Sequence, residues 1–236
     1  MAERPIFIPT TEAGGYVKRI DLEIPWAGGF AEVQKKKNIR SLHDAAKRAG
    51  HTPLLEVSSK SDEIAGRHLS AFHLRVSLGE REMPLENAFQ GSKVFEHGGP
   101  FTDLFEVDPR EAKRDPRLRT SGALKGFEFD GYEFPLKPAT VFYDWLYLNA
   151  IFPHRQWLKN RVDGEMRYVG FSDIEFNPSK SINCQAKSCA LFVSLMREDK
   201  LENYLQTPSQ FIAAMTAHMS DLSSHQPHVK QPRLVG

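Results

Sequence analysis

The first third of the chain combines short apolar runs, bounded by turn residues, with one longer amphipathic segment. Residues 6–8 and 18–24 are predicted as extended segments, and residues 54–57 and 71–78 as two further short strands. Over residues 38–49 the apolar positions recur at helical spacing, and a glycine follows directly. We therefore expect a helix there that ends at the glycine.

Helical periodicity dominates the rest of the chain. Residues 84–97, 140–151 and 185–198 are predicted as helices, and a further helix follows Thr207, where Thr-Pro-Ser-Gln matches a capping box. Residues 100–138 combine prolines, glycines and charges and are expected to be irregular. The fold class that we expect is α+β, mainly α-helical, with a few short strands near the N-terminus.

The domain organisation follows from what the sequence lacks. We find no internal repeat and no low-complexity linker, so residues 1–222 are expected to form a single domain that includes an N-terminal extension, residues 1–63. Residues 223–236 hold few apolar side chains and are expected to form a flexible tail. A hydrophobic content of 40% with 26% charged residues is that of a globular protein with a real core.

The charge balance and the missing motifs narrow the function. The 31 Lys and Arg residues nearly balance 30 Asp and Glu residues, which argues against a protein that coats nucleic acid but allows a local basic groove. No apolar stretch is long enough to span a bilayer and no signal peptide is present, so we expect a cytoplasmic protein without membrane contact. The spacing of Cys184 and Cys189 does not favour a disulfide, and no motif requires a metal or a cofactor.

Residues 84–97 carry the most informative pattern. At about 100° per residue, Glu86, Gln90, Lys93 and His97 fall within about 60° of one another on a helix, beside an apolar stripe. A solvated helix face with a Glu/Lys pair accounts for this pattern. The wall of a site also accounts for it, because a carboxylate can serve as general acid or base on a glycosidic bond. A lysine near apolar surface has a lowered pKa and can act as a nucleophile.

Other polar and aromatic positions are candidates with ordinary structural alternatives. Asp173 and Asn183 precede a predicted helix, where they suit sugar or anion binding, although Asn183 could equally cap the helix. Trp145 could stack on a base or belong to the core. Residues 58–61 and the turn over residues 98–101 could approach a phosphate, or could form a plain turn and a helix C-cap.

These same stretches resemble the NADAR family. Leu69-Ser70-Ala71-Phe72 stands where the family has an SNF-type motif, and the segment from Leu85 to Phe95 keeps the Glu, Phe, Gln, Lys and Phe of its S-E-H-x-F-Q-A-x-K-F helix, with one extra residue before the last Phe. Phe171-Ser172-Asp173, then Asn183, and then Ala190 to Arg197 take the places of the family's W-G-D-like segment, its Asn and its L-M-x-L-R helix end. The resemblance covers roughly residues 64–198.

The chain departs from that pattern at two places, and two additional segments point to one branch of the family. Ala71 replaces the usual Asn, and Phe171-Ser172 replaces Trp-Gly. Residues 1–63 and the turn over residues 98–101 are similar to the longer branch that accompanies DarT-type DNA ADP-ribosyltransferase toxins. This resemblance implies an antitoxin that hydrolyses the N-glycosidic bond between ADP-ribose and guanine in DNA. ADP-ribosylated DNA would be the substrate, ADP-ribose the product and a DarT-type toxin a partner.

The resemblance also implies roles for individual residues. Glu86 and Lys93 would act at the anomeric carbon, one as acid/base and the other as electrostatic partner or transient amine nucleophile. Substrate binding would fall to Ser59, Lys60, Ser70, Phe72, Gln90, Trp145, Asp173 and Asn183.

Three other functions remain open at this point. The first is an N-glycosidase of a small ribosyl-phosphate metabolite, of the riboflavin-intermediate type. The second is a non-catalytic antitoxin that binds the toxin, and the third is a reader of ADP-ribose or nucleic acid. The near-neutral charge makes strong, sequence-independent DNA binding the least attractive of these properties.

Overall fold

A four-stranded sheet forms one side of the molecule in the computed structural model, which describes residues 1–11, 15–164 and 167–224. The strand order is β2 (Val17–Ile24), β1 (Ala2–Pro9), β9 (Gly170–Ser172) and β3 (Leu54–Glu56). β1 pairs antiparallel with both β2 and β9, whereas β3 pairs parallel with β9. Strands from the beginning and the last third of the chain therefore lie side by side.

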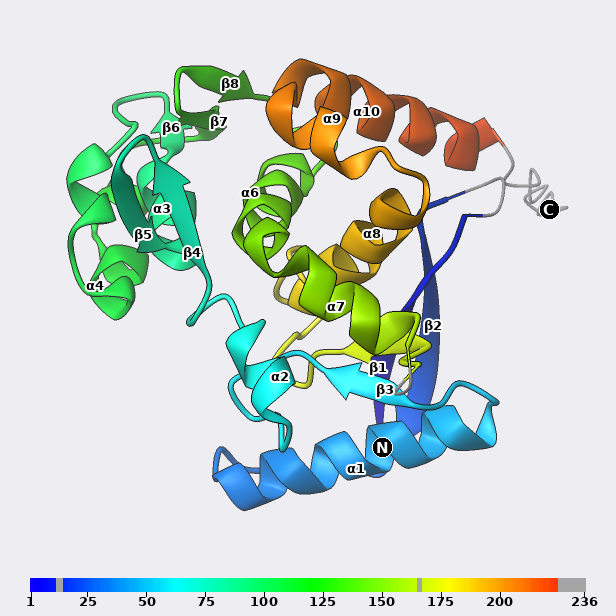
Figure 1. Cartoon of the computed structure of the whole chain (residues 1–236). Helices are drawn as coiled ribbons and strands as arrows, with labels where there is room; N and C mark the ends of the chain where they lie inside the picture. The colour runs from blue at the N-terminus through cyan, green and yellow to red at the C-terminus, as the bar shows by residue number, and fades with distance from the viewer. Residues whose placement is uncertain (12–14, 165–166, 225–236) are drawn as a thin grey trace, which may run out of the picture.

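Two helices cover the two faces of this sheet. Because side chains alternate along a strand, Ile6 of β1 faces helix α1 (Glu32–Arg48), and Phe7 faces helix α8 (Gln185–Arg197). Ile6 belongs to a small core together with Leu42 of α1, while Phe7 joins the main core of the protein. Figure 1 shows α1 running along the outer edge of the molecule and α8 close to its centre.

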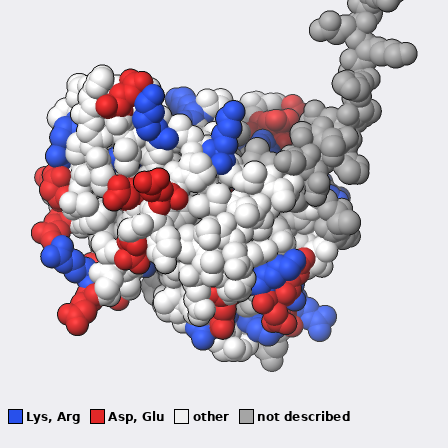
Figure 2. All heavy atoms as spheres, turned by 90° about the horizontal axis from the view of Figure 1, so that it is seen from above, with Lys and Arg blue, Asp and Glu red and all other residues white. Residues whose placement is uncertain are grey.

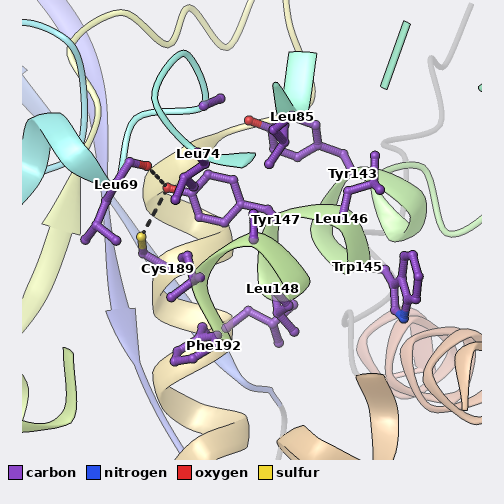
Figure 3. Close-up of a cluster of buried hydrophobic side chains, with 14 of the residues drawn as sticks. Leu69, Leu74, Leu85, Tyr143, Trp145, Leu146, Tyr147, Leu148, Cys189 and Phe192 are labelled. Carbon is purple, nitrogen blue, oxygen red and sulfur yellow. Dashed lines mark hydrogen bonds between the residues drawn. The ribbon is translucent and has the colours of Figure 1, made fainter. Parts of the chain in front are cut away.

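Helix α6 (Val141–Ile151) lies at the centre of the main core. Ten of its eleven residues are buried, so this helix has no polar face, and it packs against α8. The buried Tyr147 hydroxyl donates to the main-chain oxygen of Leu69 and lies 3.4 Å from the Cys189 sulfur (Figure 3). Through Tyr147, α6 and α8 are connected to the loop that follows α2 (Ile64–His68).

A second lobe contains the middle of the chain, from β4 to β8 (Figure 1). Helix α3 (Leu85–Gly91) connects a hairpin to a three-stranded sheet of order β6-β7-β8. The hairpin is β4 (Arg75–Leu78) and β5 (Arg81–Pro84); the sheet is β6 (Lys93–Phe95), β7 (Leu124–Phe129) and β8 (Tyr132–Phe134). Between β6 and β7 come a 3₁₀ turn (Thr102–Phe105) and the short helices α4 (Pro109–Arg114) and α5 (Arg117–Thr120).

The remaining helices close the core on its other sides. A 3₁₀ turn (Phe152–His154) and α7 (Arg155–Val162) follow α6, while α9 (Leu201–Gln206) and α10 (Pro208–Ser224) pack over α6 (Figure 1). No helix in the described part of the chain is long and apolar enough to cross a membrane. Cys184 and Cys189 are buried and free.

Several elements agree with the sequence prediction. The expected helices over residues 140–151 and 185–198 are α6 and α8, and the expected strands over residues 54–57 and 18–24 are β3 and β2. The helix expected over residues 38–49 is α1, which begins six residues earlier, at Glu32. The α+β class is confirmed. The expected tail, residues 223–236, falls almost entirely outside the described residues.

Two expectations were wrong in their local detail. The helix expected over residues 84–97 ends at Gly91, and from Lys93 the chain continues as a strand, because Lys93 pairs with Phe127 of β7. Residues 100–138, expected to be irregular, contain β7, β8, α4 and α5. The strands are consequently not confined to the N-terminal part of the chain. The strand β6 is short and pairs with a distant strand, so the local pattern gave little sign of it, whereas β7 and β8 form a local hairpin around Asp130 and Gly131 that the prediction overlooked.

Candidate functional site

Three polar side chains form a hydrogen-bonded row at the junction of α3 and β6. Gln90 Nε2 donates to Glu86 Oε1 at 2.8 Å, and Lys93 Nζ donates to Gln90 Oε1 at 2.6 Å. An amide has one accepting and one donating end, so Gln90 satisfies the cationic and the anionic neighbour at the same time. The row thus has a carboxylate at one end, a neutral bridge in the middle and an amine at the other end.

The Lys93 amine lies in a largely apolar setting. Its nitrogen is 5.0 Å from the centre of the Phe89 ring, which packs against Phe127 and Tyr143. Burial is the main cause that lowers the pKa of Lys93 below that of an ordinary lysine. The charge of Lys113 lowers that pKa further, while the charge of Glu86 raises it. A lysine in this setting holds a larger fraction of neutral, nucleophilic amine than an exposed lysine.

Close backbone packing fixes the position of Lys93. Gly99, in the turn after β6, has φ +92°, and a Cβ there would lie 2.1 Å from the main-chain oxygen of Lys93. At the end of α3, a Cβ on Gly91 would lie 2.5 Å from the Phe105 ring. Neither position has space for a side chain. The turn over residues 98–101 therefore packs directly against the backbone of Lys93. The turn is not the C-cap of α3, which ends earlier, at Gly91.

Tyr143 of α6 lies between this row and a second polar group. Burial is the main cause that raises the pKa of Tyr143 well above its ordinary value, and the nearby charges of Asp173 and Glu86 add to it. The charges of two carboxylates that are far apart in sequence therefore both act on the Tyr143 hydroxyl. Figure 3 shows this side chain extending from α6 toward Leu85, the first residue of α3. Its hydroxyl has no hydrogen-bond partner among the described residues.

Asp173 is buried directly after β9 and is tied to two other segments. Its Oδ1 accepts from the backbone N–H groups of Glu175 and Phe176, and its Oδ2 accepts from Gln185 Nε2 at 3.1 Å. Burial, reinforced by the charge of Glu56, raises the pKa of Asp173 to about 8. Asp173 can therefore hold a proton at neutral pH.

Glu56, at the end of β3, is the buried neighbour of Asp173. Its carboxylate accepts from Ser58 Oγ at 2.7 Å, from Ser172 Oγ at 2.6 Å and from the Ile174 N–H at 2.8 Å. Burial nevertheless raises the pKa of Glu56. Because two buried carboxyls oppose each other's ionisation, the pair titrates as a unit.

The loop over residues 69–74 completes this group. The backbone N–H of Ala71 donates to Gln185 Oε1 at 2.6 Å, so Gln185 connects this loop to Asp173. Ser70 is fully buried, and its hydroxyl accepts weakly from the Phe72 N–H at 3.4 Å. The Phe72 ring is 52% exposed, which leaves an aromatic face free beside the group.

A comparison with models of protein families found a match to the DarT1-associated NADAR antitoxins over residues 2–225. The chain belongs to this family. The match to the NADAR model includes β1 and β2 as well as the stretches over residues 64–198 that carry the resemblance in the sequence. The N-terminal strands are thus part of the family's domain. A search of curated proteins found no match.

Seen as a NADAR protein, the chain brings together most of the residues that the sequence singled out. Glu86, Gln90 and Lys93 form the row, and Ser70, Phe72 and Asp173 belong to the group connected through Gln185. The Oδ1 atom of Asn183 is buried and has no hydrogen-bond partner among the described residues. Cys184, and not Asn183, is the N-cap residue of α8.

Other residues of this NADAR chain are placed differently. Trp145 is buried, packs against Phe129 and Phe134, and points away from Tyr143 and Tyr147 (Figure 3). Its surroundings are those of a core residue. Ser59 and Lys60 are half-buried in the turn after β3, where the Lys60 N–H donates to Ser58 Oγ at 3.2 Å. His97 is exposed after the end of β6 and does not belong to the row of Glu86, Gln90 and Lys93.

Sequence reasoning missed four side chains of this region. They are Tyr143, Gln185, Lys113 and Lys187. The amine of Lys187 pairs with the buried Asp144 at 2.8 Å. Gln185 and Lys187 lie in the first turn of α8, where polar residues at a predicted helix start could have drawn attention. Tyr143 is one aromatic residue within an apolar run, which gives no signal in the sequence.

Two cavities in the described part of the protein lie apart from the row. One of about 730 Å³ is lined by His68, His73 and Trp157 among others, and one of about 380 Å³ lies along β7 and β8. Neither is lined by Glu86 or Lys93. The candidate site is therefore defined by its chemistry and hydrogen bonding.

Proposed function

We propose that this NADAR protein hydrolyses the N-glycosidic bond between ADP-ribose and guanine in DNA, and that it thereby reverses the modification made by a DarT-type toxin. The observation that carries the proposal is the row from Glu86 through Gln90 to Lys93. It combines a carboxylate, which can transfer protons, with a desolvated amine, which can act as the nucleophile at an anomeric carbon. Membership of the antitoxin family supports the biological role.

In the proposed reaction, the neutral amine of Lys93 attacks the anomeric carbon of the ribose. As the new C–N bond forms, the bond from that carbon to the guanine nitrogen breaks and its electron pair goes to that nitrogen, while the Glu86 carboxylate takes a proton from the attacking amine and passes it to the guanine nitrogen. A water molecule then attacks the same carbon, and Glu86 takes a proton from that water and passes it to the lysine nitrogen as the bond to lysine breaks. ADP-ribose and unmodified guanine are released, and both residues return to their starting state, a neutral amine and a carboxylate.

The surrounding residues would bind the sugar and the base. Asn183 Oδ1, which has no protein partner in the described chain, would accept a ribose hydroxyl. The exposed Phe72 ring would stack on a base, and Asp173 with Gln185 would orient water or a hydroxyl. Ser59 and Lys60 would lie against the pyrophosphate. The surroundings of Trp145 do not support a role in binding.

The test is to incubate the purified protein with a DNA oligonucleotide that carries ADP-ribosyl guanosine, with and without EDTA, and to measure released ADP-ribose. Lys93→Ala and Glu86→Gln should each lower the rate by about 10²-fold or more. Lys125→Ala, which removes an exposed lysine paired with Glu96, is the matched control and should leave the rate unchanged.

The outcomes separate the proposal from its alternatives. If the parent protein releases no ADP-ribose and the adduct stays intact, the proposal is wrong. Release of a ribose phosphate from a small metabolite, without action on DNA, would identify a metabolite glycosidase. If the Lys93→Ala and Glu86→Gln variants still protect cells from the toxin, protection comes from binding the toxin.

A further inference from the structure

Helix α4 carries a stripe of basic side chains beside the candidate site. Arg110, Lys113 and Arg114 are spaced by three and four residues, so they lie on one face of the helix, and all three are exposed. Ala112 is fully buried and lies on the side that faces the protein. We call Arg110, Lys113 and Arg114 the α4 stripe.

The α4 stripe contacts the proposed catalytic carboxylate through Lys113. Lys113 Nζ lies 3.6 Å from Glu86 Oε1, and its side chain is 59% exposed, so this pair lies at the edge of the site. The positive charge of Lys113 also lowers the pKa of Lys93. Along the helix, Arg110 lies three residues before Lys113 and Arg114 directly follows it, so the stripe spans about 6 Å.

Hydrogen bonds hold the stripe in place relative to the site. Asn87 of α3 donates through Nδ2 to the main-chain oxygens of Leu104 and Val107, both at 2.7 Å. These two bonds connect the segment that leads into α4 to helix α3. The Asp108 side chain then accepts from the Arg110 N–H at 2.8 Å and caps α4. These bonds fix the backbone of α4 relative to α3, which carries Glu86.

The two arginines are available for a ligand, in contrast to their neighbour Arg117. Arg117 is held by Asp103 and Asp115, whereas Arg110 and Arg114 form no ion pair with any described residue. The basic character is local, because the whole chain carries a formal net charge of +1. On the face in Figure 2, Lys and Arg side chains lie in mixed groups with Asp and Glu side chains.

We propose that the α4 stripe binds the phosphodiester backbone of the DNA strand next to the modified guanosine. The inference rests on the proposed function and adds to it the surface that receives the polynucleotide. Free arginines on either side of the lysine that contacts the catalytic carboxylate complement a polyanion whose modified base enters the site. Two or three phosphate contacts position a substrate without the strong general DNA binding that the near-neutral charge of the chain argues against.

The experiment compares two substrates that share the scissile bond. One is an ADP-ribosylated oligonucleotide, and the other is the ADP-ribosyl guanosine nucleoside, which has the pyrophosphate but no DNA backbone. The variant Arg110→Gln/Arg114→Gln leaves Lys113 and the row intact. The matched control is Arg40→Gln/Arg48→Gln, which removes two exposed arginines from α1 that form no ion pair with any described residue.

On the oligonucleotide, kcat/KM of the α4 variant should fall by about tenfold at low salt. Its dependence on salt should become shallower by about 0.7 in the log–log slope for each phosphate contact that is lost from a single strand. On the nucleoside, the α4 variant should match the parent, which also shows that it is folded. The α1 variant should match the parent on both substrates.

An equal loss of kcat/KM on both substrates would mean that the α4 stripe binds the ADP-ribose part. No loss of kcat/KM on either substrate would mean that the stripe has no role in binding. Both results overturn the inference. If the parent is inactive on both substrates, the proposed function fails. Whether the α4 stripe binds DNA is then tested by measuring the binding of an unmodified single-stranded oligonucleotide. Weaker binding by the α4 variant than by the α1 variant would support the stripe, and equal binding would overturn it.

Discussion

Lys93 and Glu86 do not pair with each other directly but contact opposite ends of the same amide, that of Gln90. A direct salt bridge would hold the amine in its ammonium form and raise the pKa of Lys93. The bridge instead keeps both groups in place while burial lowers that pKa. The arrangement orients an acid/base group and a nucleophile without a direct salt bridge between them.

The first prediction concerns the charge of Lys113. Its replacement, Lys113→Met, should raise the pKa of Lys93, because the positive charge of Lys113 now lowers it. The neutral amine forms as pH rises through that pKa, so the rising limb of kcat/KM should move to higher pH. The shift should be a fraction of a pH unit, since Lys113 is largely exposed and solvent screens its charge. Rates on the nucleoside substrate from pH 6 to 10 would measure it.

The control for this shift is Lys125→Met, which removes an exposed lysine whose partner is Glu96. Its pH profile should overlay that of the parent. A profile of Lys113→Met that moves to lower pH, or does not move at all, would show that Lys113 does not act on Lys93 through its charge.

The second prediction concerns the bridge. Gln90→Leu keeps the size of the side chain but removes the hydrogen bonds to Glu86 and Lys93. We expect kcat to fall by about tenfold or more, because misoriented catalytic groups lose their near-attack geometry. KM should change less. Steady-state kinetics on the nucleoside would separate the two parameters, and a variant with unchanged kcat would contradict a positioning role for Gln90.

The third prediction concerns the pH dependence of stability. The pKa of Asp173 is raised to about 8 in the folded protein, against about 3.9 in an unfolded chain. The folded state therefore holds the proton more tightly, so this contribution to stability is complete below pH 4 and is lost as pH rises toward 8. Asp173→Asn cannot ionise, and its thermal midpoint should fall less than that of the parent between pH 5 and pH 8.5.

Ser172→Ala is a useful comparison for Asp173→Asn, because it removes one hydrogen bond to Glu56 and leaves both carboxyls in place. Its stability should be lower than that of the parent and should fall with rising pH at least as steeply, because the Ser172 hydrogen bond lowers the pKa of Glu56. If Asp173→Asn and the parent lose stability in parallel over this pH range, Asp173 is not the group responsible.

The fourth prediction concerns the support behind Lys93. Gly99→Ala introduces a Cβ at φ +92° that would lie 2.1 Å from the main-chain oxygen of Lys93. Gly131→Ala is the matched control, since it has φ +74° but no atom within 4 Å. Both variants should lose about 1–3 kcal/mol through backbone strain, and Gly99→Ala should lose more because β6 must also move. Urea unfolding would measure both losses, and equal losses would show that the contact with Lys93 is not tight.

The large helices and the N-terminal strands could be predicted from the sequence, whereas the three strands β6, β7 and β8 were not predicted. The helices α6 and α8 have long apolar or periodic stretches, which give a strong local signal. The strand β6 has three residues and depends on pairing with β7, more than thirty residues further along the chain. Its first residue, Lys93, therefore appeared to continue α3.

The sequence predicted those parts of the candidate site whose residues are close together along the chain. It did not predict the parts that join distant segments. Helical spacing placed Glu86 and Gln90 together because both lie on α3, and Lys93 stayed in reach although the helix had ended. The connection from Ala71 through Gln185 to Asp173 joins three separate segments. No single window of the sequence contains it.

The order of strands in the main sheet has a consequence for synthesis on the ribosome. β9 lies between β1 and β3, so the sheet stays split into a hairpin and a lone strand until Gly170–Ser172 has left the exit tunnel. A nascent chain that ends before β9 already contains Glu86 and Lys93 but lacks Asp173 and Gln185. The carboxylate–amine row and its second polar group can thus meet only late in translation, when most of the antitoxin chain has been made.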